Sequence, residues 1–349
     1  MRRGVRWGVA LALGVMGGWL CSRLHTPIPW MLGPLLALAT VRIAGTAIEA
    51  PPVARYLGQW VIGTTLGLYF TPLVIREVGA AWHLLAAGAA FAVAVGYLSG
   101  LALARLAGID RTTAIFASVP GGASEMMVLG ERFGARGDRV AAAQSLRILV
   151  VVIVVPFTFA GLGLHGSDVY VPGARTFDPV GFAELMAATL VGCLVFQRMA
   201  APNAFVLGSL AVAIALTAGE VELSAMPPLV SNAGQCLLGC ALGSRFQPDF
   251  LRGAHRFVAA VVTTVLLAIA LSTGFGLLLA GLSGRPAATL VLGMAPGGIA
   301  EMAITAKVLQ LGVPLVTAFH VTRVVVLLLA TTPIFAAVSR LAARRPSSR

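Results

Sequence analysis

The chain has 349 residues, 58% of them hydrophobic and only 11% charged, and its formal net charge is +12. Because an ordinary soluble domain carries about 25% charged residues, this composition excludes a typical soluble fold and indicates a polytopic membrane protein. The positive charge lies mainly at the ends of apolar runs, where it predicts membrane topology and contact with anionic lipid headgroups. We therefore expect membrane lipids, and no nucleic acid, among its partners.

In chain order, ten apolar runs are long enough to cross a bilayer, with allowance for tilt and short ends. They cover residues 5–22, 29–45, 56–75, 80–104, 138–160, 179–197, 203–218, 230–245, 257–282 and 314–338. Two further apolar stretches, 112–130 and 287–309, each contain a Pro-Gly-Gly sequence. The first run follows basic residues, as in a signal peptide, but no small-x-small cleavage pattern follows it, and we expect it to remain as a span.

The two Pro-Gly-Gly stretches carry the same motif. Residues Pro120-Gly121-Gly122-Ala123-Ser124-Glu125-Met126 recur, 176 positions later, as Pro296-Gly297-Gly298-Ile299-Ala300-Glu301-Met302. The same shift places Arg147 on Arg323 and Gln59 on Gln235. The chain is therefore predicted to be an internal duplication, with membrane repeat 1 at 1–160, a linker at 161–178, membrane repeat 2 at 179–340 and a basic cytoplasmic tail at 341–349.

The arginines between the apolar runs distinguish two topologies. If both motif stretches cross the membrane, there are twelve spans, and three loops contradict the positive-inside tendency. If each stretch dips in and returns to its own side, there are ten spans, and the arginines at 132, 136, 139, 245, 252 and 256 all become cytoplasmic. We prefer ten spans, with both termini cytoplasmic, in the bacterial inner (plasma) membrane.

Five spans per repeat insert the second repeat upside down, which is the plan of many secondary transporters. The expected fold class is an all-α polytopic membrane protein of two inverted repeats, with about five transmembrane helices each and 10–12 membrane segments in total. Each repeat contains a Pro-Gly-Gly re-entrant or broken helix.

A Pro-Gly-Gly break at membrane depth frees backbone amides and carbonyls, so it must be buried in protein or line a water-filled cavity. The helix expected after the glycines points its amides and its positive dipole end at the break, which favours an anion such as a substrate carboxylate. Gly121, Gly122, Gly297 and Gly298, with Ser124 of the first motif, are therefore candidate substrate-binding residues, because glycine lets a ligand approach the main chain. A packed loop that binds nothing is the alternative.

Glu125 and Glu301 lie two residues into these helix starts, where a glutamate can cap its own helix. The alternative is that they bind a coupling H⁺ or Na⁺, since ionisable residues at membrane depth are rare and usually lie on a transport path. A carboxylate that releases its cap when an ion arrives combines both roles.

Arg147 and Arg323 each lie about nine residues into a predicted span, or roughly 13 Å deep. Because unpaired charges at that depth are costly, we expect Arg–Glu pairing with Glu125 and Glu301, within or across the repeats. A permanent pair would be structural. The alternative is a guanidinium that exchanges its protein carboxylate for a substrate carboxylate.

Four more polar residues are candidates. His320, three positions before Arg323, could titrate near neutral pH and serve ion coupling, and Gln144 occupies the equivalent position before Arg147. Gln144, Gln59 and Gln235 are candidate cavity-lining residues. A packing role or bonds to neighbouring helices is the alternative for each of them.

The doubled Pro-Gly-Gly-x-x-Glu-Met motif with its downstream arginine resembles the bacterial AbrB-type membrane protein family. Its members have two copies of one membrane domain and are often labelled AbrB family transcriptional regulator or ammonia monooxygenase. The resemblance implies an indirect role in regulating gene expression, without DNA contact. More distantly, the five-plus-five plan is similar to 2-hydroxycarboxylate and glutamate symporters, which implies a substrate site at the four motif glycines.

A membrane copper monooxygenase would need clusters of ligands at helical or hairpin spacing. The five histidines are scattered and the four cysteines form no framework, so we expect no enzyme, no metal and no cofactor. The preferred interpretation is a secondary transporter of a small organic anion, coupled to H⁺ or Na⁺, with a midplane site between the two motifs. A membrane sensor that affects gene expression indirectly is the alternative, and a homodimer is left open.

Overall fold

The computed structural model describes residues 3–121, 123–166, 172–174, 176–246 and 255–327, without the side chains of Ala123 and Ser124. These residues form helices and no strand. The helices are α1 (Arg3–Arg23), α2 (Pro29–Ile43), α3 (Pro52–Gly67), α4 (Pro72–Ala80), α5 (Trp82–Ala107), α6 (Arg111–Ser118), α7 (Ala123–Arg132), α8 (Gly137–Gly161), α9 (Pro179–Arg198), α10 (Ala204–Ala218), α11 (Pro228–Gly243), α12 (His255–Ser283), α13 (Ala287–Met294) and α14 (Ile299–Leu309), followed by a last described helix, Val313–Leu327. The predicted basic tail at 341–349 lies outside the described residues.

Five helices are long and apolar enough to cross a membrane by themselves, namely α1, α5, α8, α9 and α12. α3 and α4 together form a sixth candidate span, bent by 91° at their junction. α2, α10 and Val313–Leu327 are apolar but shorter. The prediction of an all-α polytopic membrane protein is confirmed, whereas the count of ten crossing spans stays a prediction.

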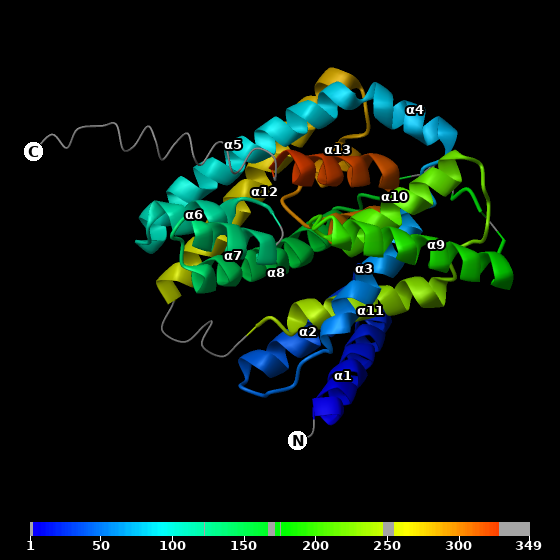
Figure 1. Ribbon diagram of the computed structural model, residues 1–349. Coiled ribbons are helices and arrows are strands. Elements are labelled where there is room, and N and C mark those ends of the chain that lie inside the picture. The colour runs from blue at the N-terminus through cyan, green and yellow to red at the C-terminus, as the bar shows by residue number, and fades with distance from the viewer. Residues whose placement is uncertain (1–2, 122, 167–171, 175, 247–254, 328–349) are drawn as a thin grey trace, which may run out of the picture.

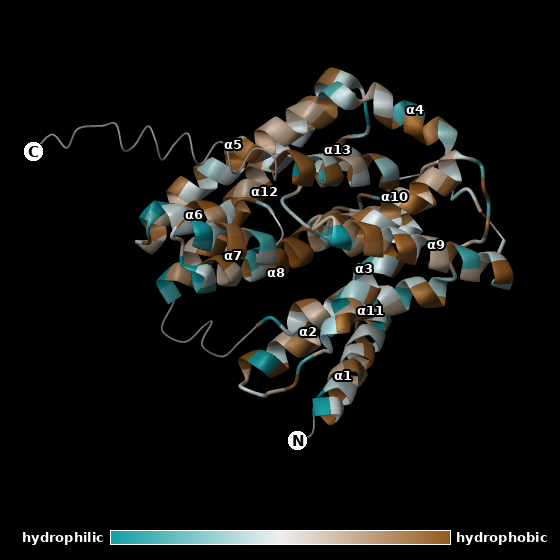
Figure 2. Cartoon of the chain, viewed as in Figure 1, coloured by the Kyte–Doolittle hydropathy of each residue, from teal (hydrophilic) through white to brown (hydrophobic). Residues whose placement is uncertain are grey.

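The exposed apolar side chains of the long helices agree with a lipid environment. Leu266, Leu271 and Leu278 on α12 and Val191 and Val195 on α9 are all exposed, at 42–60% of their area. A soluble protein rarely exposes such contiguous apolar surface. Figure 2 shows hydrophobic residues along the outer helices and hydrophilic ones mainly near helix ends.

Helix boundaries recur along the chain. α3 and α11 have start and end points 176 residues apart, and so do α6 and α13. α3 and α11 each begin at the second proline of a Pro-Pro pair, whose first member is extended and whose second fixes the first turn. The recurrence agrees with a duplicated chain, although the exact boundaries of the two repeats remain predictions.

The helices pack into two groups, and each group takes helices from both halves of the sequence. The first bundle contains α1, α2, α3, α9, α10 and α11. The second bundle contains α5, α6, α7, α8, α12, α13 and α14, together with the helix Val313–Leu327. In Figure 1 the α5–α12 pair is in the upper part of the view and α1, α2 and α11 are in the lower part, with α7 and α8 drawn between them. Few helix contacts join the two bundles, and they are mainly between α14 and α3.

α3 and α11 cross in opposite directions at two equivalent glycines. A Cβ on Gly58 would lie 2.7 Å from the Gly234 carbonyl oxygen and would also collide with Leu238. A Cβ on Gly234 would collide with Val61. Because a step forward along α3 is a step backward along α11, this equivalent pair is antiparallel, as inverted repeats require.

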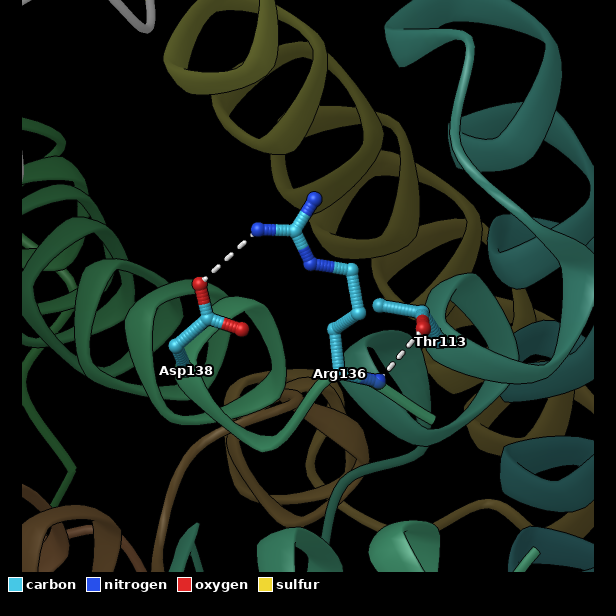
Figure 3. A network of polar contacts seen from close by, with 3 residues as sticks. All are labelled: Thr113, Arg136 and Asp138. Carbon is cyan, nitrogen blue, oxygen red and sulfur yellow. Dashed lines mark hydrogen bonds and ion pairs between the residues drawn. The ribbon is translucent and has the colours of Figure 1, made fainter. Parts of the chain in front are cut away.

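The first Pro-Gly-Gly stretch folds as a hairpin of α6 and α7, here called the first hairpin. The backbone amide of Arg136, just after α7, donates to the Thr113 hydroxyl in the first turn of α6 at 2.8 Å, and Figure 3 shows this contact together with the Arg136–Asp138 ion pair. The rings of Phe116 and Phe133 stack at 5.8 Å between centroids. The chain therefore returns to the level at which it entered.

The second Pro-Gly-Gly stretch, α13 and α14, returns in the same way and is here called the second hairpin. A Cβ on Gly312 would lie 2.8 Å from Thr289 Cγ2, and these two residues are the equivalents of Arg136 and Thr113. Both motif stretches therefore re-enter and do not continue across the protein. This geometry favours the ten-span topology over the twelve-span one.

Candidate functional site

Arg147 closes the tip of the first hairpin. Its Nη1 donates to the Val119 carbonyl at 3.1 Å and its Nη2 donates to the Gly121 carbonyl at 3.3 Å. Both carbonyls lie just past the end of α6, where no further helical turn follows and the negative end of a helix dipole lies. Arg147 is 5% exposed, so these charge-assisted bonds replace the water that this guanidinium has lost.

Arg323 does the same for the second hairpin. Its Nη1 donates to the Ala295 carbonyl at 2.7 Å, and its Nη2 donates to the Gly297 carbonyl. The expectation of Arg–Glu pairing is therefore wrong: the ion pair found among the described residues joins Arg136 and Asp138 on the surface. The physical reason is that a broken helix offers each arginine two carbonyls in fixed positions, which suit its planar fork.

Gln144 and His320 occupy equivalent positions under the two tips. The Gln144 Nε2 donates to the carbonyls of Phe116 and Val119 at 2.9 Å, and the His320 Nε2 lies 3.2 Å from the Leu292 carbonyl. Both side chains are fully buried, and neither lines a cavity described below. Their geometry supports the tips directly, and their other polar atoms, Gln144 Oε1 and His320 Nδ1, have no partner.

Glu301 begins the returning helix of the second hairpin. It lies three positions after the N-cap Gly298, where a glutamate folds back over the cap. A Cβ on Gly298 would collide with the Glu301 carboxylate, so the side chain covers this glycine. Glu301 is 7% exposed.

Glu125, its equivalent in the first hairpin, is more exposed, and its Oε2 is buried without a hydrogen-bond partner. Gly122 and the side chain of Ser124 lie outside the described residues. The structure therefore defines the second motif more fully than the first.

A cavity of about 70 Å³, here called the interbundle cavity, lies where the two hairpin tips face the first bundle. A water molecule needs about 10–15 Å³ of such space, so the cavity has room for several waters or a small ligand. Of the predicted site residues, it is lined by Gln59, Gly121, Arg147, Gly297, Gly298, Glu301 and Arg323. The described parts of Glu125, Gln144, Gln235 and His320 do not line it.

Sequence reasoning missed two charged lining residues from the first bundle, Arg55 and Arg245, and Asn203 lines the same wall. Arg55 Nη2 donates to Asn203 Oδ1 at 3.4 Å. Arg55 lies four positions before Gln59 on one face of an apolar helix, and this spacing was the available signal. Arg245 gave no such signal, because an arginine after a span is usually explained by topology.

A second, smaller cavity of about 30 Å³ lies inside the second bundle and is here called the inner cavity. It is mostly apolar, with hydroxyls from Ser99, Thr264 and Ser272. Arg147 and Arg323 line both cavities. The arginine-bound tips therefore form the partition between the two spaces.

In the part of the chain that the structure describes, no three His, Cys, Asp or Glu side chains come together in a way that could hold a metal ion. Cys236 and Cys240 are free thiols in a packed cluster with Ala10 and Leu38.

Comparisons with known proteins agree on one family. The family model described as transition state regulatory protein AbrB matches residues 3–72 and 30–339. "Uncharacterized protein YhjN" of Bacillus subtilis (strain 168) is 26% identical, over 93% of this chain and 91% of the relative. "Putative regulator AbrB" of Escherichia coli (strain K12) is 22% identical, over 98% of this chain and 99% of the relative. No solved structure matches.

Proposed function

The chain belongs to the AbrB family, and we propose that it is a secondary transporter of a small organic anion. The observation that carries the proposal is the interbundle cavity, where two broken backbones and four guanidinium groups face one another across a boundary between two helix bundles. Ligand sites of secondary transporters form where interrupted helices of two repeats meet.

The anion would bind at the hairpin tips. The helix α14 directs the positive end of its dipole and the amides of its first turn at the Gly297-Gly298 break. Arg147 and Arg323 already use Nη1 and Nη2 on carbonyls, but a guanidinium has five N–H donors, and each Nη carries a second N–H. The arginines thus hold the tips in place and have donors left for a ligand.

Glu301 is the residue that would couple transport to H⁺ or Na⁺. It is the carboxylate in the cavity lining, and it covers Gly298, where the anion would approach the main chain. A proton or Na⁺ on this carboxylate removes the negative charge that would repel the anion. Glu125 would serve the same role from the first hairpin, although its described part does not line the cavity.

The bundle boundary supplies the movement. Because few contacts join the first and second bundles, one bundle can rock against the other around the site. α6 and α13 have eight residues each, so each tip lies about 12 Å from its point of entry, near the middle of a bilayer. We propose the bacterial inner membrane, with both termini in the cytoplasm, as the setting.

Flux into proteoliposomes tests the proposal. Purified protein should concentrate a labelled organic anion when a pH or Na⁺ gradient is imposed, and Glu301→Gln should make the remaining flux independent of that gradient. Flux that is equal in empty and protein-containing vesicles, across a panel of anions bound by the protein, would refute transport.

A membrane sensor is the second candidate, because the similar Escherichia coli protein carries the name of a regulator. A sensor would bind the anion at the same cavity without moving it, and would affect gene expression indirectly. Anion binding to the protein without anion flux in proteoliposomes would support the sensor and contradict the transporter. We propose no enzymatic activity for either case.

A further inference from the structure

The four arginines that line the interbundle cavity form two pairs, one from each bundle. Arg147 and Arg323 belong to the second bundle and hold the hairpin tips. Arg55 and Arg245 belong to the first bundle, near the start of α3 and just past the end of α11. Because α3 and α11 are antiparallel, these two positions fall at the same end of the helix pair, and the two guanidiniums interact electrostatically.

Glu301 lies between the two pairs. It interacts electrostatically with Arg245 and Arg55 of the first bundle and with Arg147 and Arg323 of the second. The described lining therefore sets four guanidiniums against one carboxylate. Glu125, which lies outside the lining, also interacts with Arg245, but two carboxylates still leave two of the four guanidiniums uncompensated. Charges removed from water without compensation are unfavourable. This excess positive charge favours a ligand with more than one negative charge.

The second pair also has the surroundings of an anion site. Arg55 is oriented by Asn203, and the amide of Asn203 leaves N–H donors on the same wall of the cavity. Gln59, four residues after Arg55, is buried and lines the same wall. The first bundle contributes these N–H donors to the described lining but no carboxylate. The donors are therefore arranged for an oxyanion that comes from the ligand.

We propose that Arg55 and Arg245, with Asn203, form a second anion subsite, and that the ligand of this cavity is a small dicarboxylate. One carboxylate binds at the Gly297-Gly298 tip beside Arg147 and Arg323, and the other binds to the Arg55–Arg245 pair. This inference rests on the proposed function, since it assigns the substrate class of the same cavity.

A bridging ligand explains why the two pairs lie on different bundles. A compact dianion such as sulfate has its charges on one centre and engages one pair at a time. A chain with a carboxylate at each end joins both bundles, so that binding and bundle movement are linked. A monocarboxylate of the same length fills the space but leaves one pair uncompensated.

Ligand binding to the full-length purified protein, followed by thermal shift and titration, tests the subsite. The probes are unbranched dicarboxylates of three to six carbons, monocarboxylates of the same lengths, and sulfate. The best dicarboxylate should bind roughly 10- to 100-fold more tightly than the matching monocarboxylate, as expected for one extra charged hydrogen-bonding group. Sulfate should bind no better than the monocarboxylate.

Arg55→Gln and Arg245→Gln should reduce that preference toward unity, because they should weaken dicarboxylate binding far more than monocarboxylate binding. Arg256→Gln is the matched control, because Arg256 bonds the Leu106 carbonyl at an exposed site outside the cavity. Arg245→Lys keeps the charge and should retain most of the preference. If a glutamine variant does not fold, the lysine variant and the wild-type ligand series still decide the question.

The outcomes separate this inference from the proposed function. Equal affinity for mono- and dicarboxylates, an unchanged preference in both glutamine variants, or no binding of any dicarboxylate would overturn the subsite. Flux of monocarboxylates without dicarboxylate preference would leave transport standing and remove the subsite. Tight dicarboxylate binding that depends on Arg55 and Arg245, without flux, would support the subsite in a sensor.

Discussion

Arg323 Nη1 donates to the backbone carbonyl of Ala295 at 2.7 Å, and this bond makes a broken helix tolerable in the middle of a membrane protein. The same bond recurs 176 positions earlier between Arg147 and Val119. In each hairpin, the last carbonyls of the entering helix receive a fixed cation in place of the next helical turn. The arginines thus use one N–H of each Nη atom for structure and keep the second N–H of each for a ligand.

We expect Arg323→Ala to destabilise the protein more than the loss of a surface charge would. Two charged hydrogen bonds are lost and two buried carbonyls become unpaired, so the free energy of unfolding should fall by about 3 kcal/mol or more. The melting temperature in detergent measures this. Arg256→Ala, at an exposed site, is the control, and equal melting temperatures for the two variants would contradict the assigned role.

Gly298→Ala should impair ion coupling with little effect on the backbone. Gly298 has φ −85°, which alanine adopts freely, but a Cβ there collides with the Glu301 carboxylate. The displaced carboxylate should change the dependence of ligand binding on pH or Na⁺. Gly274→Ala is the matched control, because a Cβ at Gly274 of α12 meets nothing within 4 Å. Identical ion dependence in both variants would mean that the fit of Glu301 over Gly298 is irrelevant.

Much of the fold follows from residue patterns. The repeated motif and the recurrence of Arg147 at Arg323 predicted two equivalent units with broken helices, and the arginines in loops favoured re-entry. The sequence could not show what the buried arginines bind. Charge balance suggested Glu125 and Glu301 as the partners. The partners found are the carbonyls of Val119 and Ala295 at the helix breaks. Every residue has a carbonyl, so composition cannot show which ones a helix break makes available.

The candidate site was predicted mostly on one side. The glycines and Glu301 lie on the hairpins, and the two deep arginines lie on the helices that follow them. On the opposite wall, Gln59 was the predicted residue. The charged residues of that wall are Arg55 and Arg245, which have no charged equivalents in the other half and lie close to helix ends. Only the packing of α3 and α11 against the tips brings them into the cavity.

The first hairpin predicts that a pair of introduced cysteines would form a disulfide. Thr113→Cys and Arg136→Cys, introduced together in a background without other cysteines, should cross-link readily, since the Arg136 amide bonds the Thr113 side chain at 2.8 Å. A continuous helix would separate the two positions by about 34 Å. The gel mobility of the oxidised protein shows the cross-link. Thr113→Cys with Gly161→Cys, at the far end of α8, should not react, and reaction in the control pair alone would mean that the stretch crosses the protein.

The two motif glutamates should differ in their effects although the sequence makes them equivalent. Glu301 is 7% exposed and lines the interbundle cavity, whereas Glu125 is more exposed and lies outside its lining. Glu301 interacts with four arginines, and the interaction shown for Glu125 is with Arg245. Glu301→Gln should therefore abolish the dependence of anion binding on pH or Na⁺, and Glu125→Gln should only weaken it. Titration of anion affinity at several pH values and Na⁺ concentrations, in both variants and the wild type, measures this. Equal effects of the two substitutions would show that the hairpins contribute symmetrically, and would place the coupling ion between both carboxylates.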